Sequence, residues 1–501
     1  MLFNSLQFLV FFPLVTFIYF FLSHKYRGTF LLFASYYFYM SWRVEYLGLL
    51  IFSTLVDYTV GIKMGSCKSL FRRRNYLILS LSANIGLLFA FKYFNFLNDS
   101  LRELFNIYNV GYAVHSFDVL LPIGISFYTF QSLSYSLDVY YGKRSPEYNL
   151  IHFATYVSFF PQLVAGPIER STSLLPQFKK INYFDYHRIT AGMRLMVWGY
   201  FKKLVVADNA AVIVDRVYSN HFDYDGSILI FSTLLFAFQI LADFSGYSDI
   251  AIGSAMILGF KLRRNFNRPY LATSISDFWH RWHISLSTWF RDYLYIPIGG
   301  NRVVRWRWYY NLLITFFLSG VWHGANWTFL CWGLLHGVFF IVSDLNKMIK
   351  TKLHSVISFD HFKNIMNNNF SLFLRKLISR CFVFSIVCCA WVLFRSDSLT
   401  TSWFIFEKSF FSISQLNLEL LFEGLNQLCS DIGGGYSKRE IVFLIVGILI
   451  MNAGDHFTQS GMKIMSSYPT FLRSLVYSLL LMIILIFGMF KTQSAFIYFQ
   501  F

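Results

Sequence analysis

Apolar stretches long enough to cross a lipid bilayer recur along most of this chain. Of its 501 residues, 56% are apolar and only 14% are charged, whereas a soluble domain carries about a quarter charged residues. Crossing the hydrocarbon core takes roughly 20 apolar residues in a helix. The first stretch, residues 6–22, lacks the basic start and cleavage site of a secretion signal and is predicted to be retained. We therefore predict an all-α, polytopic integral membrane protein with about 11 to 14 membrane helices or re-entrant segments.

Basic residues gather between the apolar segments. The formal net charge is +17, but no recognised nucleic-acid motif accompanies it, so we do not expect nucleic-acid binding. The cations occur in short clusters, as the positive-inside bias predicts, and such clusters attract the headgroups of membrane lipids. The clusters are 63–74, 143–144 and 302–307. Loops after the first, third and fifth predicted spans are basic, so we expect these loops in the cytoplasm and the N-terminus outside.

The chain has no internal repeat and no separable soluble domain, so residues 1–501 are predicted to form a single membrane-embedded domain. Two polar stretches interrupt the apolar pattern. Residues 345–374 are rich in Lys and Asn and are predicted to form a polar loop in the cytosol. Residues 395–440 carry several acidic residues before a run of glycines, a pattern that indicates a loop with a short helix.

Residues 274–294 depart from the pattern of a spanning helix. Their apolar side chains, three tryptophans among them, recur at helical spacing and form one stripe, with the charged residues off it. Ser274 and Asp277 suit a helix N-terminus, because a hydroxyl and a carboxylate accept hydrogen bonds from free amides there. We predict an interfacial amphipathic helix over 274–294. A packing helix inside the bundle is the alternative.

A histidine, His323, lies between two apolar runs in the segment 318–327 (LSGVWHGANW). Flanking Gly320 and Gly324 permit close approach of a helix or a ligand, and Asn326 can form hydrogen bonds. An ionisable side chain at membrane depth is costly and is therefore a functional candidate, and neutral imidazole can accept a proton near neutral pH. From its position alone, a histidine bonded to a neighbouring carbonyl is equally open.

Three other histidines lie near the same motifs. His336 is thirteen residues beyond His323, which places it on a different face of a continuous helix, so a structural role is predicted. His283 lies at the edge of the apolar stripe, where it could face a cavity. His280 and His283 could share a metal ion, but no third ligand has suitable spacing, so no metal site is predicted.

The run 243–249 (DFSGYSD) brings polar groups next to apolar segments. Its side chains could line a polar funnel or cap a broken helix. The candidates for lining a substrate funnel are Asp243, Ser245, Asp249, Trp322 and Asn326.

A group of cations follows this run, namely Arg263, Arg264 and Arg268. Their guanidinium groups could hold the phosphates of a coenzyme A donor or meet an acidic carrier protein. The positive-inside bias explains them as well. Because the chain has no G-x-S-x-G elbow, P-loop or G-x-G-x-x-G motif, nucleotide hydrolysis and serine-triad hydrolysis are disfavoured.

Several runs together resemble the membrane-bound O-acyltransferase family, and within it the branch of bacterial alginate O-acetylation membrane proteins. These runs are 160–170 (FPQLVAGPIER), 243–249, 278–287 (FWHRWHISLS) with 291–302 (RDYLYIPIGGNR), 319–327 and 391–395 (WVLFR). The resemblance extends over nearly the whole chain, and the central runs are specific. One departure is His280, where that branch usually has arginine, so the polar side of this helix is not defined by the resemblance.

The resemblance implies a ring of helices around a thin centre, with funnels from both membrane faces meeting at a histidine. His323 matches the catalytic histidine of the family, and His283 matches its second, supporting polar position. The implied activity is transfer of an acetyl group across the bacterial cytoplasmic membrane, for O-acetylation of a cell-surface or exported polysaccharide. No bound cofactor is implied, since the donor is a cytosolic thioester, either acetyl-CoA or an acyl carrier protein.

Related bacterial systems pass the acyl group to a periplasmic or extracellular esterase-like protein. The resemblance therefore implies such a partner, and residues 395–440 are its predicted docking region. Within the family, D-alanyl transfer to teichoic acid is the alternative function. Two other classes are a scaffold that recruits the true transferase and a transporter of polysaccharide, although a transporter would show repeat symmetry and paired intramembrane charges.

Overall fold

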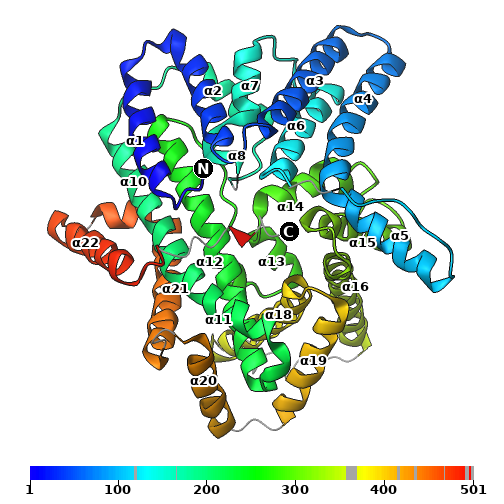
Figure 1. The fold of residues 1–501 in the computed structure, drawn as a ribbon, viewed down its shortest axis with the longest axis vertical. Helices are drawn as coiled ribbons and strands as arrows, with labels where there is room; N and C mark the ends of the chain where they lie inside the picture. Colours follow the sequence, from blue (N-terminus) through cyan, green and yellow to red (C-terminus); the bar gives the residue numbers. More distant parts are fainter. Residues whose placement is uncertain are drawn as a thin grey trace. The chain divides into compact units, whose positions relative to one another are not determined.

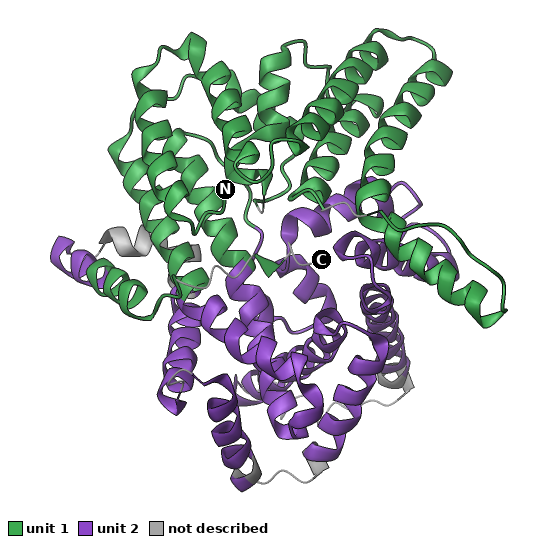
Figure 2. Ribbon diagram, in the orientation of Figure 1, with its two compact units in different colours: residues 1–204, 244–264, 477–501 green, residues 205–243, 265–476 purple. Residues whose placement is uncertain are grey.

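The computed structural model describes residues 1–117, 121–164, 166–356, 369–414, 418–433, 437–467, 469–490 and 496–497. The regular secondary structure of these residues is helical, which confirms the predicted all-α class. The chain divides into two compact units, shown in different colours in Figure 2. Unit 1 comprises residues 1–204, 244–264 and 477–501, and unit 2 comprises residues 205–243 and 265–476. Each unit is therefore assembled from segments that are distant in sequence.

Unit 1 contains the N-terminal helices (Figure 1). They are α1 (Leu6–Phe21), α2 (His24–Met40), α3 (Tyr46–Ser66), α4 (Leu70–Leu88), the π-helix η1 (Phe89–Tyr93), α5 (Phe94–Ile107), α6 (Ile125–Tyr140), α7 (Leu150–Ser158), α8 (Phe160–Leu163), α9 (Ser171–Phe178) and α10 (Tyr186–Tyr200). The π-helix η2 (Phe201–Ala207), α12 (Gly226–Leu258) and α22 (Thr470–Phe487) contribute residues to both units.

Unit 2 contains the remaining helices. They are α11 (Asp208–Ser219), η3 (His221–Asp223), η4 (Pro269–Leu271), α13 (Ile275–Arg281), α14 (Ile284–Phe290), the π-helix η5 (Arg291–Tyr295), α15 (Arg305–His323), α16 (Trp327–Val356), α18 (Asn369–Arg395), α19 (Leu399–Ser414), α20 (Leu418–Ile432) and α21 (Lys438–Ser467).

Six helices in the described part of the chain are long and apolar enough to cross a membrane. They are Tyr46–Ser66, Leu70–Ile107, Gly226–Leu258, Trp327–Lys352, Asn369–Arg395 and Thr470–Phe487. The helix α1 is also apolar but is shorter than these six helices. The protein is accordingly a multi-pass membrane protein. The higher predicted total, which counted short and re-entrant pieces, stays a prediction.

The interior of unit 1 holds a buried carboxylate where α3, α4 and α6 lie side by side (Figure 1). Asp57 of α3 accepts hydrogen bonds from Ser80 and Asn84 of α4 and from Ser132 and Ser136 of α6. Burying a carboxylate is unfavourable unless its oxygens are hydrogen-bonded. These four donors meet that requirement and join three helices through one side chain.

Three local predictions are wrong. The polar run 243–249 does not cap a broken helix, because α12 passes through it without interruption. The stretch 345–374 is not simply a loop, since α16 continues to Val356 and α18 begins at Asn369; residues 357–368 lie outside the described residues. The stretch 395–440 contains two helices, α19 and α20, where one short helix was expected; residues 415–417 and 434–436 lie outside the described residues.

Candidate active site

The segment 274–294 folds as two short helices with a sharp turn between them. The predicted helix start is confirmed, because the Ser274 hydroxyl accepts a hydrogen bond of 3.0 Å from the backbone N–H of Asp277. The predicted single helix is wrong, because α13 ends at Arg281 and α14 begins at Ile284. His283 between them has a left-handed φ of 40°, and the N–H of Ile284 donates to the carbonyl of Asn265 at 2.9 Å. A tertiary contact therefore sets this turn.

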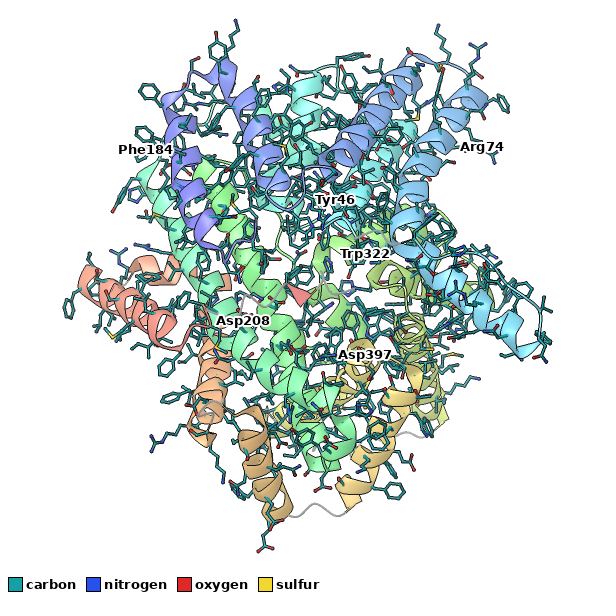
Figure 3. The ribbon with its side chains drawn as sticks, in the orientation of Figure 1. Tyr46, Arg74, Phe184, Asp208, Trp322 and Asp397 are labelled. Atoms are coloured by element: carbon teal, nitrogen blue, oxygen red, sulfur yellow. The ribbon has the colours of Figure 1, made fainter. Side chains whose placement is uncertain are left out.

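The turn places His283 in the interior of unit 2. Its side chain is fully buried, and its ring centre lies 5.9 Å from that of Trp322 on α15, which is labelled in Figure 3. Burial lowers the pKa of His283 to about 3, because removal from water disfavours the charged imidazolium. At neutral pH this imidazole is neutral, so it can form hydrogen bonds but does not act as a cationic acid.

The second candidate histidine is positioned by two tightly packed antiparallel helices, α15 and α16. A Cβ at Gly320 would lie less than 3.0 Å from the carbonyl oxygen of Phe329, and a Cβ at Gly333 would lie equally close to the carbonyl of Phe316. The glycines thus let the two backbones touch, which side chains would prevent. His323, the last residue of α15, is held against the first turns of α16 as a result.

Aromatic rings surround His323. Its ring centre lies 4.9 Å from Trp332 on α16, 5.0 Å from Trp322 and 5.3 Å from Phe394 on α18. The imidazole is 3% exposed. Three helices therefore surround one ionisable ring with aromatic side chains. In this aromatic cluster of low polarity, electrostatic interactions with a reacting group are stronger than in water.

A further histidine, His336 of α16, belongs to the same cluster. It is fully buried, and its ring centre lies 4.9 Å from that of Trp332, which also contacts His323. The indole N–H of Trp279 on α13 donates to His336 Nδ1 at 3.4 Å. The sequence predicts a structural role for His336 and gives no role to Trp332. The spacing of Phe329, Trp332 and His336, three and then four residues apart, is the signal that places them on one helix face.

Asn326 has its amide engaged by other protein groups. Its Oδ1 accepts a hydrogen bond from the backbone N–H of Thr328 at 3.0 Å, and its Nδ2 donates to the carbonyl of Asp397 at 2.9 Å. The first contact caps the start of α16, and the second ties that start to the segment between α18 and α19. Asn326 therefore fixes the connection that follows His323.

The other funnel candidates lie along α12. Asp243 and Ser245 are buried, and Asp243 belongs to unit 2 whereas Ser245 and Asp249 belong to unit 1. Within unit 1, Asp249 forms a salt bridge of 2.9 Å with Lys202, a buried lysine on the π-helix η2. The run thus contributes a partly buried ion pair beside a π-helical turn, and such turns are frequent at functional sites.

The candidate donor-binding cations differ in their surroundings. Arg263 and Arg264 are exposed on unit 1, whereas Arg268 is half-buried in unit 2. The backbone N–H of Arg263 donates to the carboxylate of Glu169, and the Arg263 Nε lies 3.9 Å from Glu169 Oε2. Glu169 is fully buried, and burial, partly offset by Arg263, raises its pKa to about 7. Glu169 therefore anchors a loop whose cations face outward.

His280, the position that departs from the family pattern, is exposed on α13. Its Nδ1 lies 2.6 Å from the carbonyl oxygen of Ser276 on the same helix. His283, by contrast, is buried, so the two side chains have different surroundings. Among the residues that the structure describes, no three metal-ligating side chains lie together.

Sequence comparisons identify known proteins that this chain resembles. The model of MBOAT, the membrane-bound O-acyltransferase family, matches residues 77–387. The chain is 37% identical to the probable alginate O-acetylase AlgI of Pseudomonas aeruginosa, over 83% of this chain and 77% of that protein. It is 32% identical to the peptidoglycan O-acetyltransferase of Helicobacter pylori, over 100% and 98% of the two chains. Identity to the teichoic acid D-alanyltransferase of Bacillus subtilis is 30%, over 43% and 57%.

The matched region includes the two short helices with His283, the α15–α16 pair with His323, and most of α18. It therefore contains the buried histidines of unit 2 and the rings of Trp322 and Trp332, whereas Phe394 lies beyond it. An imidazole among such rings suits proton transfer during acyl exchange. The protein is an acyltransferase, and the chain belongs to the membrane-bound O-acyltransferase family.

Proposed function

We propose that this protein transfers an acetyl group from a cytosolic thioester to a hydroxyl, and so serves O-acetylation of a cell-surface or exported polysaccharide. The observation that carries this proposal is the enclosure of His323 by Trp322, Trp332 and Phe394 at the junction of α15 and α16. An imidazole surrounded by apolar rings is suited to removing a proton from a hydroxyl.

In the proposed reaction His323 is the general base. It takes the proton from the acceptor hydroxyl while the oxygen attacks the thioester carbonyl carbon. The carbon–sulfur bond then breaks, and the thiolate leaves with the proton that His323 had taken. Proton transfer by a positioned side chain is worth roughly 10²- to 10⁴-fold in rate, and placing the two substrates together supplies much of the remainder.

His283 is proposed as the supporting polar group of the site. Its burial beside Trp322 and its lowered pKa keep it neutral, so its role would be to orient a substrate or the Trp322 ring by hydrogen bonding and packing. A neutral imidazole offers one donor and one acceptor nitrogen.

Acetyl transfer is favoured over D-alanyl transfer by the extent of the similarity. The two O-acetylating relatives align with 83% and 100% of this chain, whereas the D-alanyltransferase aligns with 43%. The cations Arg263 and Arg264 are the proposed contacts for the donor, because exposed guanidinium groups suit the phosphates of acetyl-CoA or of a carrier protein. Dependence on a D-alanyl carrier protein would contradict this assignment.

The acceptor is proposed to be an esterase-like protein outside the bacterial cytoplasmic membrane, which then modifies the polysaccharide. Its proposed docking region is 395–440, where α19 and α20 expose aromatic side chains such as Trp403, Phe410 and Phe422. Co-purification of an active system without any such protein would contradict the partner proposal.

The test is polysaccharide acetylation in cells that carry wild-type or His323→Ala protein, with membrane levels matched by immunoblot. Loss of acetylation at equal protein level is the expected result. The matched control is His115→Ala, which alters an exposed histidine of unit 1. If His323→Ala cells acetylate normally, the chain acts as a scaffold or transporter and His323 is a packing residue.

A further inference from the structure

Three buried nitrogen atoms in the aromatic cluster of unit 2 have no hydrogen-bond partner among the described residues. They are Nε1 of Trp332, Nε1 of Trp391 and Nε2 of His336. All three side chains are at most 1% exposed. Almost every buried polar group in a folded protein is hydrogen-bonded. Three unpaired donors in one aromatic cluster therefore indicate binding of a molecule that brings an acceptor.

The hydrogen bond between Trp279 and His336 fixes which nitrogen of His336 carries its proton. An indole N–H is only a donor, so His336 Nδ1, which it contacts at 3.4 Å, accepts. In a neutral imidazole the proton then lies on Nε2. The unpaired nitrogen of His336 is thus an N–H donor, as are the two indole nitrogens.

Ring contacts connect these donors to His323. Trp332 lies 4.9 Å from both His323 and His336, measured between ring centres, and 6.1 Å from Trp391. Trp332, one of the rings in contact with the proposed general base, therefore also carries an unpaired donor.

We propose that the indole N–H of Trp332 and the Nε2–H of His336 bind the carbonyl oxygen of the acyl group during transfer. This inference rests on the proposed function, because it assigns donors to the same reaction. When the acceptor hydroxyl attacks, the carbonyl π electrons move onto that oxygen and His323 takes the hydroxyl proton. The two donors stabilise the resulting oxyanion until the carbon–sulfur bond breaks and the thiolate leaves with the proton. Trp279 is a positioning residue in this scheme, since it keeps the His336 proton on Nε2.

The experiment measures kcat and KM for acetyl-CoA hydrolysis or transfer in membranes that contain wild-type or Trp332→Phe protein. Removing one donor to an oxyanion lowers kcat by about 10²- to 10³-fold, and we expect this loss with little change in KM. The control is Trp306→Phe on the same helix pair, because Trp306 is 69% exposed and therefore lies outside the buried aromatic cluster. We expect its kinetics to match the wild type.

Replacement of Trp332 by benzothienylalanine separates the donor from the ring. This residue keeps the shape of indole and has sulfur in place of the N–H, so folding is preserved where phenylalanine would leave a gap. A loss of kcat with the isostere at wild-type melting temperature supports the proposal. Wild-type kcat with the isostere overturns it and makes the Trp332 ring a packing element.

Trp279→Phe tests the role of His336 independently. Without the indole donor the His336 proton can occupy Nδ1, so we expect a fall in kcat smaller than that of Trp332→Phe. An unchanged kcat in Trp279→Phe and in His336→Phe overturns the assignment of His336. His323→Ala distinguishes a failure of the proposed function from a failure of this inference. Acetyl transfer that is retained in His323→Ala contradicts the proposed function. Transfer that is lost in His323→Ala but retained in the Trp332 isostere contradicts this inference alone.

Discussion

Gly320 of α15 faces the carbonyl oxygen of Phe329 on α16 so closely that a Cβ at position 320 would approach it to less than 3.0 Å. The contact lies one helical turn before His323. It sets how near the two backbones come and therefore where the imidazole sits relative to Trp332. At Gly320, which helps to position His323, there is no space for even one methyl group.

Substituting this glycine tests the contact. We expect Gly320→Ala to lower the free energy of unfolding by about 1–3 kcal/mol, because overpacking forces the backbones apart, and to reduce acetylation. Gly86→Ala is the control: a Cβ there meets nothing within 4 Å, and alanine is favoured over glycine in a helix by about 0.5–1 kcal/mol. Thermal unfolding in detergent measures both, and equal melting temperatures for the two variants would argue against close packing at Gly320.

The buried carboxyl of Glu169 predicts a dependence of stability on pH. Its pKa is about 7 in the folded protein, above the roughly 4.3 of an unfolded chain. The folded state therefore keeps the proton that the unfolded state releases, and this contribution to stability decreases as the pH rises from about 4.3 to about 7.

Glu169→Gln removes this titration and keeps an oxygen that can accept from the Arg263 N–H. We expect the melting temperature of the variant to exceed that of the wild type at pH 8, with the difference disappearing as the pH falls below the roughly 4.3 of the unfolded chain. The exposed Glu103→Gln on α5 serves as the control. A difference between Glu169→Gln and wild type that is constant across this range would contradict the prediction.

Removing the carboxylate at Asp57 is expected to destabilise unit 1. Asp57→Ala leaves four side-chain donors of α4 and α6 without their acceptor, and we expect a loss of about 2 kcal/mol or more. Asp57→Asn keeps one acceptor oxygen and should lose less. The comparison is Asp99→Ala, which removes an exposed ion pair with Arg102 worth about 0–1 kcal/mol. Similar melting temperatures for Asp57→Ala and Asp99→Ala would rule out a stabilising role for the hydrogen bonds of Asp57.

The two hydrogen bonds of Asn326 can be separated by substitution. Asn326→Asp retains an acceptor for the Thr328 N–H and loses the donor to the Asp397 carbonyl, whereas Asn326→Ala loses both. A helix cap is worth about 1 kcal/mol, so we expect Asn326→Ala to unfold at the lowest temperature and Asn326→Asp to lie between it and the wild type. The opposite order of the two variants would mean that the cap contributes little.

The features that the sequence predicted are those that depend on local pattern. Apolar length predicted the membrane helices, and the residues Ser274 and Asp277 predicted a helix start that is present. The break at His283 was missed, because the apolar stripe continues through it and the turn depends on a hydrogen bond from Ile284 to distant Asn265. Polar content similarly suggested an interruption at 243–249, yet the flanking apolar residues sustain α12.

The candidate site was predicted in part. Motif resemblance selected His323 and His283, and the structure places both in unit 2 with Trp322 between them. Helical spacing indicates that Trp332 and His336 share one face of a helix. Their meeting with His323 and Phe394 could not be inferred, because it arises where α16 and α18 meet the end of α15. Asn326 was expected to line a funnel, and its bond to the Asp397 carbonyl is a contact over 71 residues that no local pattern indicates.

The hydrogen bonds of Asp57 also constrain the order in which this chain enters the membrane during synthesis. Its α4 partners, Ser80 and Asn84, follow Asp57 by 23 and 27 residues, whereas Ser132 and Ser136 of α6 follow by 75 and 79. Chains emerge N-terminus first, and a carboxylate in lipid without donors is strongly disfavoured. The α3–α4 hairpin is therefore the smallest nascent fragment that brings Asp57 into the bilayer with any of its donors, and only the arrival of α6 completes the set.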